Sequence, residues 1–199
     1  MSVRQILLRQ VKLFLVILVG YLAQVSIMPY LQFGGVTPSL LLAVTAIVTV
    51  GYGMLRGLWA GMFYGIVMEI MLPTVPMLNL LFYPVSALLC SVFFADKSEA
   101  RLQYERSTGR KGRNISPLLR TVLCAAMNVT IYEIVNLVFM YLSGADLTAA
   151  LIQRGLTDVL ATTGLTAVIM VPVRKLLGFR KKEEVPVAEL RFDRRPARD

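Results

Sequence analysis

The chain has 199 residues, of which 56% are hydrophobic, with a mean hydropathy of +0.66 and a formal net charge of +9. Apolar content this high, arranged in long uncharged runs, predicts an integral membrane protein and argues against a soluble domain. The chain has no histidine, and both of its cysteines lie inside apolar runs. This composition argues against a zinc site, a Ser-His-Asp triad or a histidine-based proton relay.

Hydropathy, together with the positions of proline and glycine, predicts an all-α membrane protein, a compact bundle of six transmembrane helices in one domain, residues 1–178. Thr37 is expected to cap the second helix with Pro38 as its first residue, and Ser116-Pro117 is expected to open the fifth. Pro84 predicts a kink in the fourth. The spans are expected at about residues 7–28, 38–55, 57–72, 76–95, 117–142 and 157–177.

Three segments fall outside these spans. Residues 96–116 form a basic, hydrophilic loop that is expected in the cytoplasm. Residues 143–154 predict a short amphipathic helix that lies flat on the membrane surface before the last span and ends at Gly155. The charged tail, residues 179–199, is predicted to be cytoplasmic and disordered.

The charges give the orientation of the predicted bundle. Of the 21 lysines and arginines, all but Arg154 fall on segments that six spans place on one side of the membrane. The positive-inside rule makes that side the cytoplasm, so both termini are expected there. The net charge is then a topology signal and an attraction to anionic membrane lipid, and we expect no nucleic-acid partner.

Three glycines, Gly57, Gly61 and Gly65, recur every four residues in the third span, and Glu69 continues the same spacing. On an α-helix these positions form one stripe, and glycines in a stripe allow a neighbouring backbone to approach closely. The stripe, with Pro38, is therefore interpreted as a helix-packing or partner interface. Packing within the protein's own bundle is favoured over dimerisation.

Acidic and amide side chains in the spans are expected to form a polar cluster in the outer half of the bundle. At ~1.5 Å per residue, Glu69 lies ~18 Å from Gly57, and Glu133 lies ~24 Å from Pro117. Two interpretations stay open: a pocket for a ligand or coupling ion, or hydrogen bonds between helices, of which the second is favoured. The candidate residues are Glu69, Asn79, Asn128, Glu133, Asn136, Arg154 and Asp158. No motif indicates catalytic residues, metal ligands or a cofactor, so an enzyme is not predicted.

Residues 30–95 resemble the rod shape-determining protein MreD family. The resemblance rests on Gly35-Val-Thr-Pro38-Ser-Leu-Leu-Leu, on Arg56-Gly57, and on the glycine-spaced helix that ends in an acid at Glu69. Ser39 stands where the family has aspartate after the proline, and Glu69 stands where it usually has a second aspartate. The loop 96–116 and the tail are longer than the family pattern.

The resemblance implies a bacterial inner-membrane, multi-pass protein of the cell-elongation machinery without catalysis of its own. Its implied partners are an MreC-like periplasmic coiled-coil protein, a RodA-type glycosyltransferase and a class B penicillin-binding protein. The family's fold also resembles the six-helix substrate-binding subunits of energy-coupling-factor vitamin importers. In that alternative the outer polar cluster would hold a vitamin under loop 30–37, with Tyr30, Phe33 and Tyr141 contributing. An ion-coupled carrier or flippase is less favoured, because the cytoplasmic halves of spans two to four are apolar.

Overall fold

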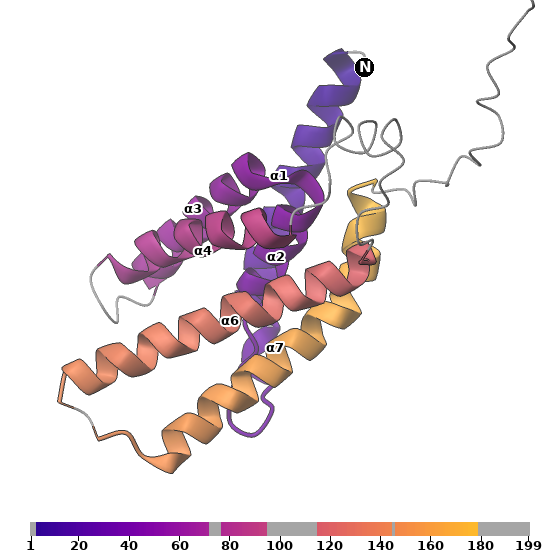
Figure 1. The fold of residues 1–199 in the computed structure, drawn as a ribbon. Helices are drawn as coiled ribbons and strands as arrows, with labels where there is room; N and C mark the ends of the chain where they lie inside the picture. Colours follow the sequence, from indigo (N-terminus) through magenta and orange to yellow (C-terminus); the bar gives the residue numbers. More distant parts are fainter. Residues whose placement is uncertain (1–2, 72–76, 95–114, 145, 179–199) are drawn as a thin grey trace, which may run out of the picture.

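The computed structural model describes residues 3–71, 77–94, 115–144 and 146–178, and these ranges contain helices and no β-strand (Figure 1). The prediction of an all-α protein is therefore confirmed for the described part of the chain. Most of loop 96–116 and the whole tail 179–199 lie outside the described residues. The elements are α1 (Val3–Ser26), the 3-10 turn η1 (Met28–Tyr30), α2 (Leu40–Tyr52), α3 (Met54–Met71), α4 (Leu78–Phe94), α6 (Pro117–Leu142) and α7 (Ala149–Leu176).

Four segments of the described chain are long and apolar enough to cross a membrane. They are Gln10–Tyr30, which covers most of α1 and η1, and the helices α3, α6 and α7. The helices α2 and α4 are equally apolar but have only 13 and 17 residues. By length and composition the chain is thus a multi-pass membrane protein.

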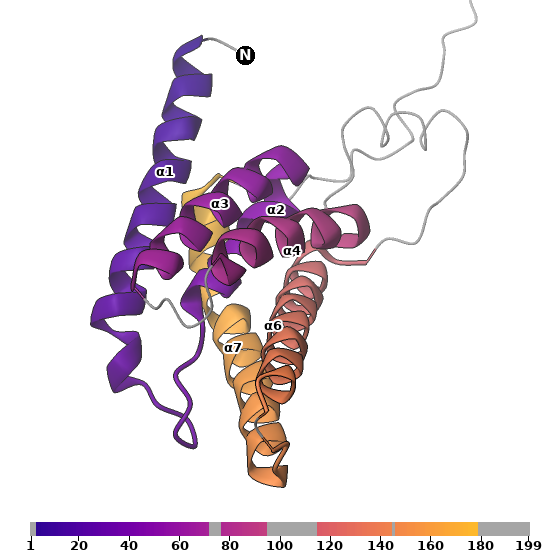
Figure 2. The ribbon, with the colours of Figure 1, turned by 90° about the vertical axis from the view of Figure 1, so that its left-hand side faces the viewer.

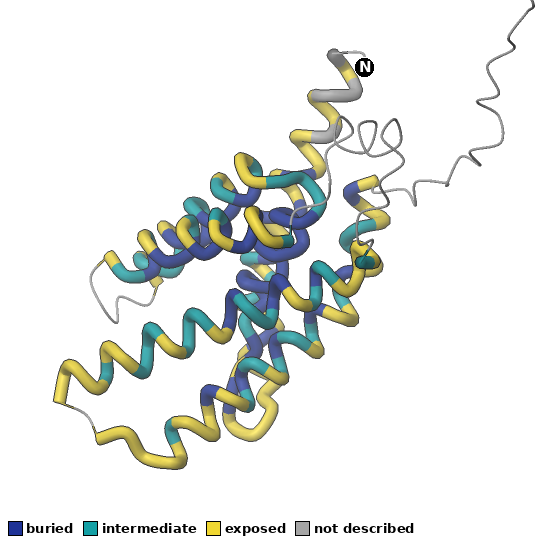
Figure 3. The backbone as a smooth tube through the Cα atoms, viewed as in Figure 1, coloured by how far each residue is buried: buried dark blue, intermediate teal, exposed yellow. Residues whose placement is uncertain are grey.

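The centre of the molecule is α2. Every residue from Leu40 to Val50 is buried, because α1, α3, α4, α6 and α7 all pack around this helix (Figure 3). Because α2 is apolar on all sides, no face of it has to reach water, and the other helices can surround it completely. Figures 1 and 2 show the other helices as two adjacent pairs, α3 with α4 and α6 with α7, and α1 at the edge of the molecule.

The glycine stripe of α3 lies against α4. A Cβ atom added at Gly61 would lie 2.7 Å from the Tyr83 carbonyl oxygen, and one added at Gly65 would lie 2.8 Å from the Asn79 carbonyl oxygen. Gly57 is packed in the same way against Thr49 of α2. All three glycines are buried, as is Pro38 just before α2. The three glycines are packing positions inside the bundle, and a partner could reach them only by displacing α4 or α2.

Two predicted helix boundaries are wrong. The N-cap of α2 is Ser39 and not Thr37: the Ser39 hydroxyl oxygen accepts a hydrogen bond from the Leu42 N–H at 3.4 Å, and Pro38 precedes the cap. The separate interfacial helix at 143–154 does not exist, because α7 continues from Ala149 through Gly155 to Leu176. Gly155 is a packing position: a Cβ added there would lie 3.0 Å from the Glu133 carboxylate.

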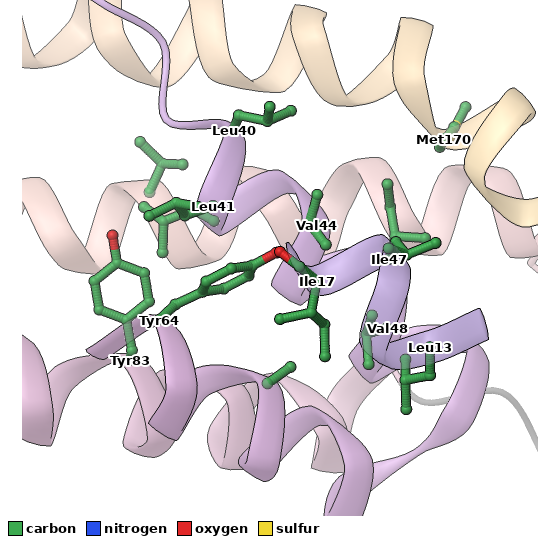
Figure 4. Packing of buried hydrophobic residues seen from close by; sticks show 14 of the residues in the cluster. Leu13, Ile17, Leu40, Leu41, Val44, Ile47, Val48, Tyr64, Tyr83 and Met170 are labelled. Atoms are coloured by element: carbon green, nitrogen blue, oxygen red, sulfur yellow. The ribbon is translucent and has the colours of Figure 1, made fainter. Parts of the chain in front are cut away.

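The contact between α1 and α3 is made by a buried tyrosine. The Tyr64 hydroxyl donates a hydrogen bond to the Ile17 carbonyl oxygen at 2.9 Å (Figure 4), and Gly20 leaves room for it.

Tyr64→Phe is expected to lower the free energy of unfolding by ~1 kcal/mol, the net contribution of one such bond. An SDS-unfolding titration in mixed micelles measures this. The control Tyr141→Phe changes an exposed hydroxyl and should leave stability unchanged; equal losses in the two variants would contradict the assignment.

Candidate functional site

A polar network surrounds the N-terminal end of α2. The backbone N–H of Ser39 donates to the Thr162 hydroxyl oxygen at 2.9 Å, and the N–H of Leu40 donates to the Gln24 side-chain oxygen at 2.6 Å. The Thr162 hydroxyl in turn donates to the Asp158 carboxylate at 3.0 Å. The first N–H groups of a helix have no partner inside the helix and need such acceptors when they are buried. Here α1 and α7 supply them.

Aromatic side chains extend this network to α4 and α6. The Tyr83 side chain lies near that of Ser39, and Tyr83 is almost wholly buried. The Tyr132 ring lies 5.1 Å from the Phe82 ring and 6.4 Å from the Tyr83 ring, measured between centroids. We call the whole group the polar hub. Its members are Gln24, Ser39, Tyr83, Tyr132, Glu133, Arg154, Asp158 and Thr162.

The acidic part of the hub joins α6 to α7. The carboxyl groups of Glu133 and Asp158 lie near each other, and the Arg154 charge lies near both. Asp158 is buried, Glu133 is half-buried, and Arg154 is exposed. A cation beside two acids reduces the electrostatic cost of placing them together. The arrangement can therefore hold the two helices in register without a bound ligand.

Glu69 and Asn79 lie away from the hub, at the junction of α3 and α4. The Glu69 Oε1 atom accepts a hydrogen bond from the Met77 N–H at 2.7 Å, just before α4 begins. The other oxygen, Oε2, is buried and has no hydrogen-bond partner in the described part of the chain. A carboxylate at this position caps the start of α4 and is favoured by the helix dipole.

The predicted asparagines of α6 occupy two further positions. Asn128 is fully buried between α4 and α6, where its Oδ1 atom accepts a hydrogen bond from the Cys90 thiol at 2.9 Å. Its Nδ2 atom contacts the Cys124 sulfur at 4.0 Å. Asn136 is half-buried and lies nearer the far end of the same helix.

The structure thus brings together three of the seven predicted cluster residues: Glu133, Arg154 and Asp158. Sequence reasoning missed the other members of the hub. One signal was available, since Thr162 lies four residues after Asp158 and so shares its helix face. The contributions of Gln24, Ser39 and Tyr83 depend on which helices pack against each other. The hydrophobic periodicity of the sequence does not give this information.

Beside the hub, a pocket of about 380 Å³ lies between the loop before α2 and the start of α7. The aromatic residues expected to close such a pocket are elsewhere: Tyr30 is 87% exposed, and Phe33 and Tyr141 also face outward. The lining residues are Gly34, Gly35, Ala150, Gln153, Arg154 and Thr157.

The described residues include no group of three or more His, Cys, Asp or Glu side chains that could hold a metal ion. Comparison of the chain with protein-family models, curated proteins and solved structures finds no match. What the site does must therefore be inferred from its residues.

Proposed function

We propose that this protein is a non-enzymatic scaffold of the bacterial cell-wall elongation machinery. It would bind an MreC-like periplasmic coiled-coil protein and link it to a RodA-type glycosyltransferase and a class B penicillin-binding protein. The proposal takes α1, α2, α3, α4, α6 and α7 as six spans of the bacterial inner membrane, with both termini in the cytoplasm. It is supported by the MreD-like pattern around Pro38 and Gly57–Glu69 and by two features of the bundle.

The first feature is that basic residues gather at one end of the bundle. Tyr52, at the end of α2, reaches the Leu177 carbonyl oxygen after α7 at 3.4 Å, and the Arg56 guanidinium lies 4.7 Å from the centre of the Tyr52 ring. Arg174 donates a hydrogen bond to Thr121 of α6 at 3.3 Å. The polar hub lies at the other end of α2. This supports a cytoplasmic basic end and an outward-facing hub.

The second feature, which carries the proposal, is the outer half of α6, which other helices cover only in part, through the contacts of Tyr132 and Glu133 with α4 and α7. The buried residues of this helix all precede Thr130, and no residue from Thr130 to Leu142 is buried (Figure 3). Asn136 lies in this half, is half-buried, and shares the helix face of Tyr132 and Glu133. An amide at lipid depth gains a hydrogen bond when another helix covers it. This face therefore fits the membrane span of a partner.

Affinity purification of a tagged copy from native membranes in mild detergent tests the proposal. We expect mass spectrometry to identify the coiled-coil protein and the two wall synthases. Asn136→Leu is expected to lower their recovery several-fold. The control Val138→Leu alters an exposed residue on the opposite side of α6 and should leave recovery unchanged. Absence of all three proteins from the wild-type preparation would overturn the proposal.

One observation favours a second candidate, a substrate-binding subunit of an energy-coupling-factor vitamin importer. The pocket beside the hub lies where that alternative requires a ligand, and Gly34 approaches Thr157 of α7 so closely that an added Cβ would lie 3.4 Å from its methyl group. The pocket lacks an aromatic lining, which such sites normally use. ATPase subunits and a stoichiometric vitamin in the same purification would make this the better assignment.

A further inference from the structure

The outer face of α1 is uncovered along the whole membrane-spanning part of the helix. α1 stands at the edge of the molecule, and its first turns project beyond the other helices (Figure 2). It packs mainly against α2, through Leu13, Val16, Ile17 and Gly20, all of which are buried. The opposite face carries apolar side chains from Leu8 to Val25, with the exposed Lys12 at its edge near the N-terminal end.

These exposed side chains follow a heptad spacing. Steps of three and four residues alternate along the face, and leucine recurs every seventh residue, at Leu8, Leu15 and Leu22. This is the spacing that lets two helices pack knobs into holes along a coiled coil. At about 100° per residue the row lies diametrically opposite the buried face. We call it the α1 seam; it consists of Leu8 (51% exposed), Val11 (54%), Leu15 (50%), Leu18 (38%), Leu22 (52%) and Val25 (50%).

We propose that the α1 seam joins two copies of this chain in a parallel dimer. Every copy enters the membrane in the same orientation, so two α1 helices meet in parallel, and a heptad seam is complementary to itself about a twofold axis. Six half-exposed side chains from each copy would bury on the order of 1,000 Å² in total, which reaches the size of a small specific interface.

The seam is also suited to association inside a bilayer. Helices in lipid associate through van der Waals packing, which interdigitating leucine and valine side chains of a heptad seam would supply. Arg4 lies on the same face one turn before Leu8 and is exposed, so it ends the apolar seam outside the membrane. The inference is independent of the proposed function, because the outer half of α6 belongs to a different face of the bundle.

Cysteine cross-linking of the full chain in native membranes tests the dimer. Leu15→Cys and Leu22→Cys lie on the seam, whereas Phe14→Cys and Val19→Cys are equally exposed controls on its flanks, at 59% and 51%. With copper phenanthroline as oxidant we expect disulfide-linked dimer at both seam positions, several-fold more than at the flanks. The two native cysteines are buried, so the unchanged chain gives the background.

A second measurement separates specific packing from chance collision. Energy transfer between copies labelled at the N-terminus and reconstituted in dilute liposomes should be high for the wild type. The double variant Leu15→Ala/Leu22→Ala is expected to lower it several-fold, and Phe14→Ala/Val19→Ala to leave it unchanged. Equal cross-linking at all four positions, or equal energy transfer in both double variants, would overturn the proposal.

Discussion

Gly61→Leu is expected to abolish the native packing of α3 against α4. The α4 backbone occupies the space that any side chain at this position would need: a Cβ there would lie 2.7 Å from the Tyr83 carbonyl oxygen and 3.0 Å from Pro84 Cα. Backbone cannot move aside as a flexible side chain does, so the two helices must separate. Even Gly61→Ala is expected to lower the free energy of unfolding by about 1–3 kcal/mol, the usual cost of overpacking.

Gly164 offers a matched control for this prediction. It is also a helical glycine in a membrane-spanning segment, but an added Cβ would meet nothing within 4 Å. Gly164→Ala should be neutral or stabilising by up to ~1 kcal/mol, the helix-propensity difference. SDS-unfolding titrations of both alanine variants measure the contrast. A Gly61→Ala variant as stable as Gly164→Ala would show that α3 and α4 are not in close contact at this point.

Thr162→Val is expected to cause the second large loss of stability. The variant removes the acceptor of the Ser39 N–H and the donor to Asp158, and leaves both groups buried without these partners. Each unsatisfied buried group costs about 1–3 kcal/mol, so the free energy of unfolding should fall by about 2–6 kcal/mol. Valine has the same shape as threonine, so the loss reports the hydrogen bonds and not a cavity.

Thr166, one turn further along α7, is the control. It is also fully buried, but its hydroxyl donates only to the Thr162 carbonyl oxygen, a bond that the helix does not require. Thr166→Val should therefore change stability by less than ~1 kcal/mol. If both valine variants unfold at the same SDS fraction, the hub does not contribute to stability in the way the geometry indicates.

The helices could be predicted from hydropathy because each is a long apolar run bounded by proline, glycine or charge. The close packing of α3 could be predicted too, since small residues at four-residue spacing have one common physical use in lipid. The error at Gly155 has a clear origin. Glycine serves both as a helix end and as a close-packing position, and only the contact with Glu133 on another helix distinguishes the two.

The polar cluster could be predicted only in part, because depth along a helix does not give the direction a side chain faces. Depth alone groups Glu133 with Asp158, and the structure places these two side chains near each other. Glu69 has a similar depth, yet it continues the stripe of Gly61 and Gly65, so once the stripe packs on α4 it must face α4 as well. That inference was available from the spacing. The role of Ser39 could not be inferred from the sequence, because it depends on α7 lying beside the start of α2.

Site-specific photocrosslinking in living cells tests the central claim, that the outer half of α6 binds the membrane span of a partner. A benzophenone amino acid at position 136 is compared with the same group at position 138, on the opposite side of the helix. The scaffold proposal predicts a crosslink from position 136 to an MreC-like coiled-coil protein and none to it from position 138. Crosslinks from both positions to lipid alone, or from position 136 to an ATPase subunit, would contradict it.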